Sequence, residues 1–300
     1  MNHPSIQLVE VGPRDGLQNE PTVIPTAVKR ELIQRLAAAG LRWIEATAFV
    51  SPRWVPQMAD HSELLRQLPQ DSEIHYPVLT PNLQGFEKAI AAGARDVSVF
   101  AAASERFSQH NINCSIEESL QRFEPIMARA REQGIQVRGY VSCVLGCPYE
   151  GEISPDAVAR VAGRLFAMGC QQISLGDTIG TGTPLKARQM VERVAEVVPI
   201  DQLAAHFHDT YGQALANLYA VLDLGIRTID TSVAGLGGCP YARGASGNVA
   251  TEDVVYMLHG MGIDTGVDLP ALVATAHWIC GQLNRPVNSR VARALPPSLS

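Results

Sequence analysis

Apolar and polar positions follow a repeating order along the chain, in which an amphipathic helix ends at a glycine and a short apolar strand begins soon afterwards. Glycine suits the end of a helix because the residue there commonly adopts a left-handed backbone conformation. The order recurs at five places, where helix ends at 36–40, 91–93, 132–134, 167–169 and 223–225 precede strands at 43–46, 97–100, 137–141, 173–175 and 228–230. It predicts strands that alternate with helices.

The starts of the helices carry their own signals. Thr80-Pro81, Ser154-Pro155 and Thr183-Pro184 each combine a capping hydroxyl with a proline suited to the first helical position. Residues 115–118, Ser-Ile-Glu-Glu, fit a capping box, in which the side chain of the first residue and that of the last each accept a hydrogen bond from the other's backbone N–H. These signals predict helices that begin directly after the named positions.

Between these signals we predict eight strands, near 6–11, 42–47, 74–79, 96–102, 136–142, 171–176, 203–208 and 227–233. Eight strands alternating with helices indicate an α/β protein built as a (β/α)8 TIM barrel. An open doubly wound sheet is the alternative, but no G-x-G-x-x-G follows the first strand. We expect a single domain over 1–300, with the barrel at about 5–264 and a C-terminal helix and tail at 265–300, in which 271–283 is helical.

Composition narrows the function classes. Hydrophobic residues make up 46% of the chain and charged residues 18%, which is typical of a well-buried globular enzyme. A net charge of −6 and no Lys/Arg run argue against nucleic-acid binding, and no apolar stretch is long enough to span a membrane. The N-terminus does not read as a targeting leader, and the six cysteines are scattered as expected of reduced thiols, so we expect a cytoplasmic protein.

Histidines at positions 206 and 208 are the strongest chemical signal in the chain. Side chains at i and i+2 of a strand point to the same face, so both imidazoles can reach one metal ion. In a barrel of this kind the chemistry lies at the carboxyl ends of the strands, where Asp15 also falls. Two ordinary strand histidines are the alternative. With Asp15 they form a two-histidine, one-carboxylate set suited to Mg²⁺ or Mn²⁺, and the amide oxygen of Asn248 is a hard ligand that such ions also accept.

Other polar residues fall at the same strand ends. Arg14 either pairs with Asp15 or stabilises an oxyanion on a thioester or ketone. Glu45 and Asp177 are members of a structural network or take part in the chemistry. Asp209 points away from the two histidines and is expected to be a cap or a supporting group.

The segment 235–248 holds five glycines in fourteen residues, which predicts an active-site lid. Its Cys239 is either a small buried apolar residue or an acid or base, because the pKa of a thiol is easily moved toward neutrality.

Five motifs, at 11–20, 45–58, 111–118, 174–180 and 235–248, resemble the 3-hydroxy-3-methylglutaryl-CoA lyase family. The resemblance covers about 5–285. Related barrel enzymes that carry out Claisen-type and aldol-type chemistry share only the Arg-Asp-Gly turn and the two histidines, so the longer motifs and the cysteine segment decide for this family.

The resemblance implies a lyase that splits 3-hydroxy-3-methylglutaryl-CoA into acetyl-CoA and acetoacetate, as in leucine catabolism and ketone-body formation. It implies a divalent metal, Mg²⁺ or Mn²⁺, held by Asp15, His206, His208 and Asn248. Arg14 and Cys239 are then catalytic, with Asp15 or His206 as the base. Gln18, Glu45 and Asp177 would bind substrate or support the ligands. The acyl-CoA is the small-molecule partner, and the family suggests a homodimer.

Three other functions fit part of the same pattern. A lyase for a longer branched acyl-CoA, of the isohexenylglutaryl type, would differ only in pocket volume. A Claisen-type synthase shares the Arg-Asp-Gly turn but commonly carries a long C-terminal extension. A catalytically silent barrel that only binds acyl-CoA or a partner protein is a different class, and the joint presence of the candidate catalytic residues argues against it.

Overall fold

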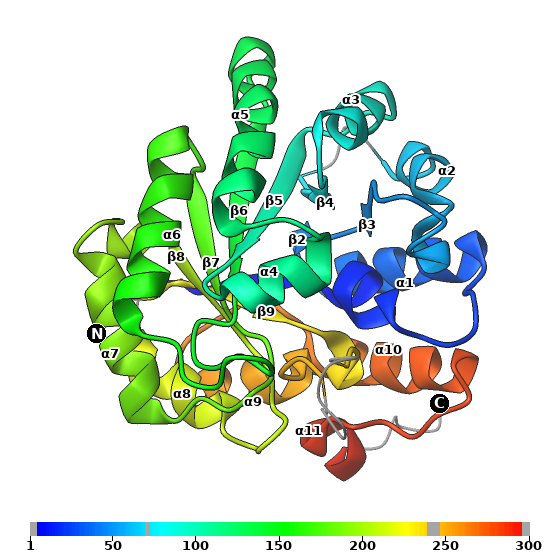
Figure 1. Ribbon diagram of the computed structural model, residues 1–300. Helices are drawn as coiled ribbons and strands as arrows, with labels where there is room; N and C mark the ends of the chain where they lie inside the picture. The colour runs from blue at the N-terminus through cyan, green and yellow to red at the C-terminus, as the bar shows by residue number, and fades with distance from the viewer. Residues whose placement is uncertain (1–4, 70–72, 239–246, 296–300) are drawn as a thin grey trace.

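The computed structural model describes residues 5–69, 73–238 and 247–295. Its strands lie at the centre, with helices around them (Figure 1). All strands pair in parallel, in the order β2-β1-β9-β8-β7-β6-β5-β4-β3. They are β1 Gln7–Glu10, β2 Trp43–Ile44, β3 Thr47–Ala48, β4 Val78–Leu79, β5 Asp96–Ala102, β6 Gln136–Ser142, β7 Gln172–Asp177, β8 Leu203–Phe207 and β9 Thr228–Thr231.

The strand predicted at 42–47 is divided into two, and this division closes the barrel. β2 pairs with β1, whereas β3 pairs with β4 at the other end of the sheet. Between them, the backbone N–H of Glu45 donates to Glu10 on one side. The next N–H, of Ala46, donates to Pro77 on the other side. Because one short segment bonds to both ends of the sheet, the predicted (β/α)8 TIM barrel is confirmed.

Helices follow the strands as the repeat predicts. They are α1 Thr26–Ala38, α2 His61–Arg66, α3 Leu83–Ala91, α4 Glu105–Ile112, α5 Ile116–Gln133, α6 Pro155–Met168, α7 Pro184–Ala195, α8 Ala214–Leu222, α9 Thr251–Gly260, α10 Leu269–Gln282 and α11 Arg290–Ala294. The predicted C-terminal helix is therefore confirmed as α10, which packs against α1. No helix in the described ranges has both the length and the apolar character that crossing a bilayer requires.

Two of the four predicted helix starts are confirmed with their caps. The hydroxyl of Ser154 accepts a hydrogen bond from Ala157 N at the start of α6, and Ser115 forms a complete capping box with Glu118 at the start of α5. Thr183 precedes α7 as predicted, but its side chain makes no capping hydrogen bond.

The start predicted at Thr80-Pro81 is wrong. α3 begins three residues after Thr80, and the side chain of Asn82 caps it by accepting a hydrogen bond from Gly85 N at 2.9 Å. The Thr80 hydroxyl instead donates to the backbone oxygen of Ser98 on the neighbouring strand, at 3.2 Å. The hydroxyl is therefore used to join strands and is not available to cap the helix.

The two faces of the strands differ in chemistry. On β7, Ile173 and Leu175 pack into the apolar core, whereas Ser174 between them is buried and bonds to Asp230 of β9. On β9 the apolar Ile229 belongs to the core and the adjacent Asp230 does not. Because successive side chains point to opposite faces, the barrel is apolar beneath its helices and partly polar inside.

Candidate metal centre

Asp15, His206 and His208 come together at the carboxyl ends of their strands. One ligand atom from each residue lies within 4.8 Å of the others, although 191 positions separate Asp15 from His206 in the sequence. Both histidines are buried and Asp15 is partly exposed. The predicted two-histidine, one-carboxylate set is thus brought together in space, a donor set suited to a divalent ion with open coordination positions.

The alternation of β8 aims the two histidines. Phe207 between them is fully buried in the apolar core, which turns His206 and His208 to the inner face. The Nδ1 atom of His208 is buried and has no hydrogen-bond partner among the described residues. A buried ring nitrogen without a hydrogen-bond partner costs free energy. A metal ion bound at Nδ1 would remove that cost, and one bound at Nε2 would hold the ring in place. The residues therefore fit a divalent ion.

Asp15 lies in a short π-helical turn, Gly12–Gly16, which follows β1 closely. The backbone N–H groups of Asp15 and Gly16 both donate to Val11 O, at 2.8 and 3.1 Å. A Cβ atom on Gly16 would lie 2.8 Å from Cβ of Leu236, so only glycine allows this turn to approach the segment after β9. Gly16 of the Arg-Asp-Gly motif thus helps to place the Asp15 carboxylate beside the histidines.

Asn248 lies next to both the candidate metal ligands and the turn. Its neighbour Val249 donates its N–H to Phe207 O at 3.1 Å, which places Asn248 alongside β8. The Asn248 amide donates to Oδ2 of Asp15 at 2.8 Å and to the backbone oxygen of Leu236 at 3.2 Å. The amide group therefore contacts Asp15 through its NH₂ group, and its oxygen as a ligand stays a prediction.

Charges at the centre favour an ionised Asp15 and a neutral His208. Burial raises the pKa of Asp15, but the charges of Arg14 and of the two histidines outweigh it and hold that pKa well below its usual value. Burial, together with the charge of His206, lowers the pKa of His208 to about 4. A carboxylate and a neutral imidazole are the forms that bind a metal.

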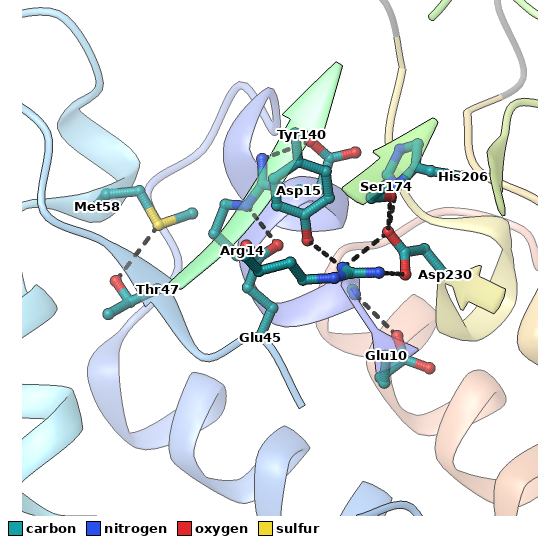
Figure 2. Close-up of polar contacts among 12 residues, drawn as sticks. Glu10, Arg14, Asp15, Glu45, Thr47, Met58, Tyr140, Ser174, His206 and Asp230 are labelled. Atoms are coloured by element: carbon teal, nitrogen blue, oxygen red, sulfur yellow. Dashed lines mark hydrogen bonds and ion pairs between the residues drawn. The ribbon is translucent and has the colours of Figure 1, made fainter. Parts of the chain in front are cut away.

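Arg14 is held from two sides. Its Nε donates to Oε2 of Glu45 at 2.7 Å, and its Nη1 donates to Oδ1 of Asp15 at 2.7 Å. Its guanidinium also lies 5.6 Å from the ring centroid of Tyr140 (Figure 2). Both roles considered for Arg14 remain compatible with this geometry, because Nη2 has no hydrogen-bond partner among the described residues and can still donate to a ligand. Glu45 contacts the arginine rather than the metal ligands.

Asp177 and Asp209 organise loops. Asp177 is fully buried and accepts hydrogen bonds from the backbone of Thr181 and Gly182, which fixes the loop after β7. Burial raises the pKa of Asp177 to about 6. Asp209 accepts from Ala214 N at 3.0 Å and pairs with Arg290, as expected of a capping group.

Two predicted site residues are not placed in contact with the centre. Gln18 is half-buried just after the π-helical turn, and its side chain makes no hydrogen bond to a described residue. Cys239 and most of the predicted lid, 239–246, lie outside the described residues. Their roles stay predictions.

Asp230 and Arg138 are part of the site and were missed by sequence reasoning. Asp230 is fully buried on β9 and forms a hydrogen bond with Nδ1 of His206 at 3.1 Å (Figure 2). Burial raises the pKa of Asp230, but the charge of Arg138 outweighs it and the pKa falls to about 2. The signal in the sequence was a charged residue within each of two buried strands, which is unusual unless the two are paired.

A cavity of about 630 Å³ opens beside Asn248. Its lining includes Asp209 and Tyr211 after β8, Asp253 at the start of α9, and two basic residues of the C-terminal helix, Arg290 and Arg293. The cavity places open space next to Asn248, and its two aspartates and two arginines balance in charge, with Arg290 paired to Asp209 at 3.1 Å.

A (β/α)8 barrel with a candidate metal site at the carboxyl ends of its strands defines the class of this protein. The HMGL-like family model matches residues 5–279, so the chain belongs to the HMGL-like family.

Named relatives agree with this assignment. The chain is 61% identical over 289 residues to the mitochondrial hydroxymethylglutaryl-CoA lyase of Rattus norvegicus, covering 96% of this chain and 89% of the relative. It is 59% identical to the cytoplasmic 3-hydroxy-3-methylglutaryl-CoA lyase of Mus musculus, over 96% of this chain and 84% of that protein. The crystal structure of hydroxymethylglutaryl-CoA lyase from Pseudomonas aeruginosa is 57% identical, covers 98% of both chains and superposes with a TM-score of 0.95.

Proposed function

We propose that this protein is a lyase that cleaves 3-hydroxy-3-methylglutaryl-CoA to acetyl-CoA and acetoacetate. One observation carries the proposal: in a member of the HMGL-like family, Asp15, His206 and His208 gather at one point with Arg14 beside them. The names of relatives that are about 60% identical support the same substrate.

We assign the metal to Asp15, His206, His208 and Asn248, with Mg²⁺ or Mn²⁺ as the ion. When bound, a divalent ion supplies a Lewis acid that makes the C3 hydroxyl of the substrate more acidic. The oxygen and nitrogen ligands suit either ion. The acidic side chain of Asp15 also brings the negative charge that attracts a cation to the site.

Side chains of the protein then transfer the protons and stabilise the charge that develops in the reaction. Asp15 or His206 takes the proton from the C3 hydroxyl, the bond between C2 and C3 breaks, and a ketone forms at C3. The electron pair of that bond passes to the thioester as an enolate, whose oxygen accepts hydrogen bonds from Arg14. Cys239 returns a proton to C2 of the enolate, which completes acetyl-CoA.

The geometry of Arg14 supports its part in this scheme. Glu45 and Asp15 fix the guanidinium by two hydrogen bonds of 2.7 Å, so its orientation is set before substrate arrives. A preorganised donor stabilises a developing anion better than one that must reorient. Because Arg14 is only 6% exposed, little water competes for its remaining donor.

We further propose a homodimeric, cytoplasmic enzyme of one domain, 1–300. The curated relatives include both mitochondrial and cytoplasmic forms, and cysteines scattered as reduced thiols fit the reducing cytoplasm. α10 packs on α1 and on the turn Val233–Gly235, which supports a C-terminal region that belongs to the barrel.

Product analysis tests the proposed reaction. Purified protein is incubated with 3-hydroxy-3-methylglutaryl-CoA, and acetyl-CoA and acetoacetate are quantified by chromatography and mass spectrometry. Equal amounts of both products support the lyase. A longer branched 3-hydroxyglutaryl-CoA is assayed in parallel. A kcat/KM higher for this substrate than for 3-hydroxy-3-methylglutaryl-CoA would support the isohexenylglutaryl alternative. Condensation of acetyl-CoA with a keto acid in place of cleavage would support a synthase, and substrate binding without any turnover would support a silent barrel.

A further inference from the structure

A buried polar network lies beneath the candidate metal centre and contacts one of its proposed ligands, His206. Its centre is Asp230, whose side chain has no solvent exposure. Four donor atoms from three residues surround this one carboxylate: two nitrogens of Arg138, the hydroxyl of Ser174 and Nδ1 of His206. Figure 2 shows the carboxylate of Asp230 facing His206 and Ser174 inside the barrel. Such a concentration of donors on one buried group calls for a reason beyond packing.

The contact with His206 determines which ring nitrogen remains available. Nδ1 of His206 lies 3.1 Å from Oδ2 of Asp230. Because a carboxylate only accepts hydrogen bonds, the proton of a neutral imidazole must reside on Nδ1 in this contact. Nε2 then carries the free lone pair, which is the form required of a metal ligand. An imidazole used in this way has no second lone pair to accept a proton, so of the two candidate bases this contact favours Asp15.

Arg138 and Ser174 hold Asp230 in place. Arg138 donates through Nη2 to Oδ1 at 2.6 Å and through Nη1 to Oδ2 at 3.0 Å, a bidentate pair that spans 92 positions of the chain. Ser174 donates to Oδ2 at 2.8 Å. A carboxylate held at both oxygens cannot rotate away from the imidazole, so the ring orientation of His206 is fixed as well.

We propose that Asp230 is a positioning residue, which fixes the tautomer and orientation of His206 so that Nε2 faces Asp15 and His208 for metal binding. Arg138 is its anchor. The proposal rests on the proposed metal centre and assigns to Asp230 no contact with substrate.

An amide cannot replace this carboxylate. All three residues around Asp230 point donor atoms at it, and the side chain of asparagine would present NH₂ hydrogens to at least one of them. Asp230→Asn therefore leaves Arg138 with an unpaired charge and weakens the constraint on His206. Partners of metal-binding histidines typically contribute about 10- to 100-fold to metal affinity, so we expect the Kd for Mn²⁺ to rise by about that factor.

The experiment measures Mn²⁺ binding to the metal-free protein, without substrate, by the electron paramagnetic resonance signal of free Mn²⁺. Asp60→Asn is the matched control, because Asp60 pairs with buried Lys29 at 2.8 Å and neither residue hydrogen-bonds to a metal ligand. We expect Asp60→Asn to bind Mn²⁺ like the wild type and Asp230→Asn to bind it about 10- to 100-fold more weakly.

A second measurement reads the tautomer directly and needs no variant of Asp230. Long-range ¹H–¹⁵N spectra of the metal-free wild type, labelled at histidine nitrogens, distinguish a proton on Nδ1 from one on Nε2; a His206→Gln sample assigns the signal. We expect the proton on Nδ1 of His206.

The outcomes separate this proposal from the proposed function. A wild type that binds no Mn²⁺ contradicts the metal centre, whereas the tautomer still tests the contact with Asp230. Wild-type affinity in folded Asp230→Asn, or a proton on Nε2 of His206 in the wild type, overturns the positioning role. Weaker binding in Asp230→Asn with the proton on Nδ1 in the wild type supports it.

Discussion

The buried ion pair between Arg14 and Glu45 makes a prediction that can be compared with an exposed pair in the same chain. Nε of Arg14 lies 2.7 Å from Oε2 of Glu45, and the glutamate side chain has no solvent exposure. Nε of Arg35 lies 2.8 Å from Oε1 of Glu31, but both of these side chains are more than 40% exposed. Glu45→Gln and Glu31→Gln thus each remove the charge of one partner of an ion pair. The two pairs differ in burial and in the hydrogen bond, which Arg14 Nε makes to Glu45 and Arg35 Nε does not make to Glu31.

We expect Glu45→Gln to lower the free energy of unfolding by about 1.5–3 kcal/mol, the usual contribution of a hydrogen bond to a charged group. The loss stays below the 3–5 kcal/mol expected when a buried pair is broken outright, because glutamine can still accept from Arg14 and Asp15 still pairs with it. Glu31→Gln should cost at most about 1 kcal/mol, since exposed pairs contribute little.

Turnover should fall as well, because Glu45 sets the position of Arg14. A displacement of about 1 Å at a reacting group costs about 100-fold in rate, and we expect a loss of that order in kcat for Glu45→Gln. Urea unfolding gives the stabilities, and the assay of acetoacetate release gives kcat. Equal stability losses in the two variants, or a wild-type kcat in Glu45→Gln, would refute the reasoning that burial makes this pair the anchor of Arg14.

Two further predictions concern charge. Arg14→Gln should lower kcat by several powers of ten yet still bind Mn²⁺, because it removes the oxyanion donor and leaves every proposed ligand in place; near-normal turnover would contradict that role. Burial raises the pKa of Glu252 to about 8, above its usual 4.5, so the folded state holds a proton that the unfolded state releases. The stabilisation that this bound proton gives to the folded state is complete below about pH 4.5 and is lost as the pH rises through 8. The free energy of unfolding falls by up to about 1.4 kcal/mol per pH unit in this range. Urea unfolding from pH 5 to 9 should show this decline, and Glu252→Gln should flatten it; equal slopes in both proteins would exclude Glu252 as its source.

The sequence predicts much of the fold because its signals are local. Strands at 96–102 and 136–142 have the predicted bounds, since long apolar runs between clear helix signals leave little freedom. The division of the second strand depends on which neighbours its backbone meets. Those neighbours are the backbone oxygens of Glu10 and Pro77, which are distant from the second strand in the sequence.

The proximity of Asp15, His206 and His208 could be predicted because strand alternation and strand ends are properties of a short stretch of sequence. Asp230 could not be recognised in the same way, because its role depends on Arg138, which is 92 positions away. The polar pair lies within strands whose remaining residues are mostly apolar, a pattern that indicates burial without indicating which partner is present. The roles of Cys239 and of the segment around it stay predictions.

The most direct test of a metal-dependent lyase is to remove the metal and restore it. The protein is treated with a chelator, freed of it by gel filtration, and assayed for acetoacetate release from 3-hydroxy-3-methylglutaryl-CoA before and after addition of Mg²⁺ or Mn²⁺. We expect release to fall to background after chelation and to return with the added ion in the wild type, and to stay at background in His208→Ala at the same metal concentration. Full activity in the chelated, metal-free protein would contradict the proposed mechanism at its centre.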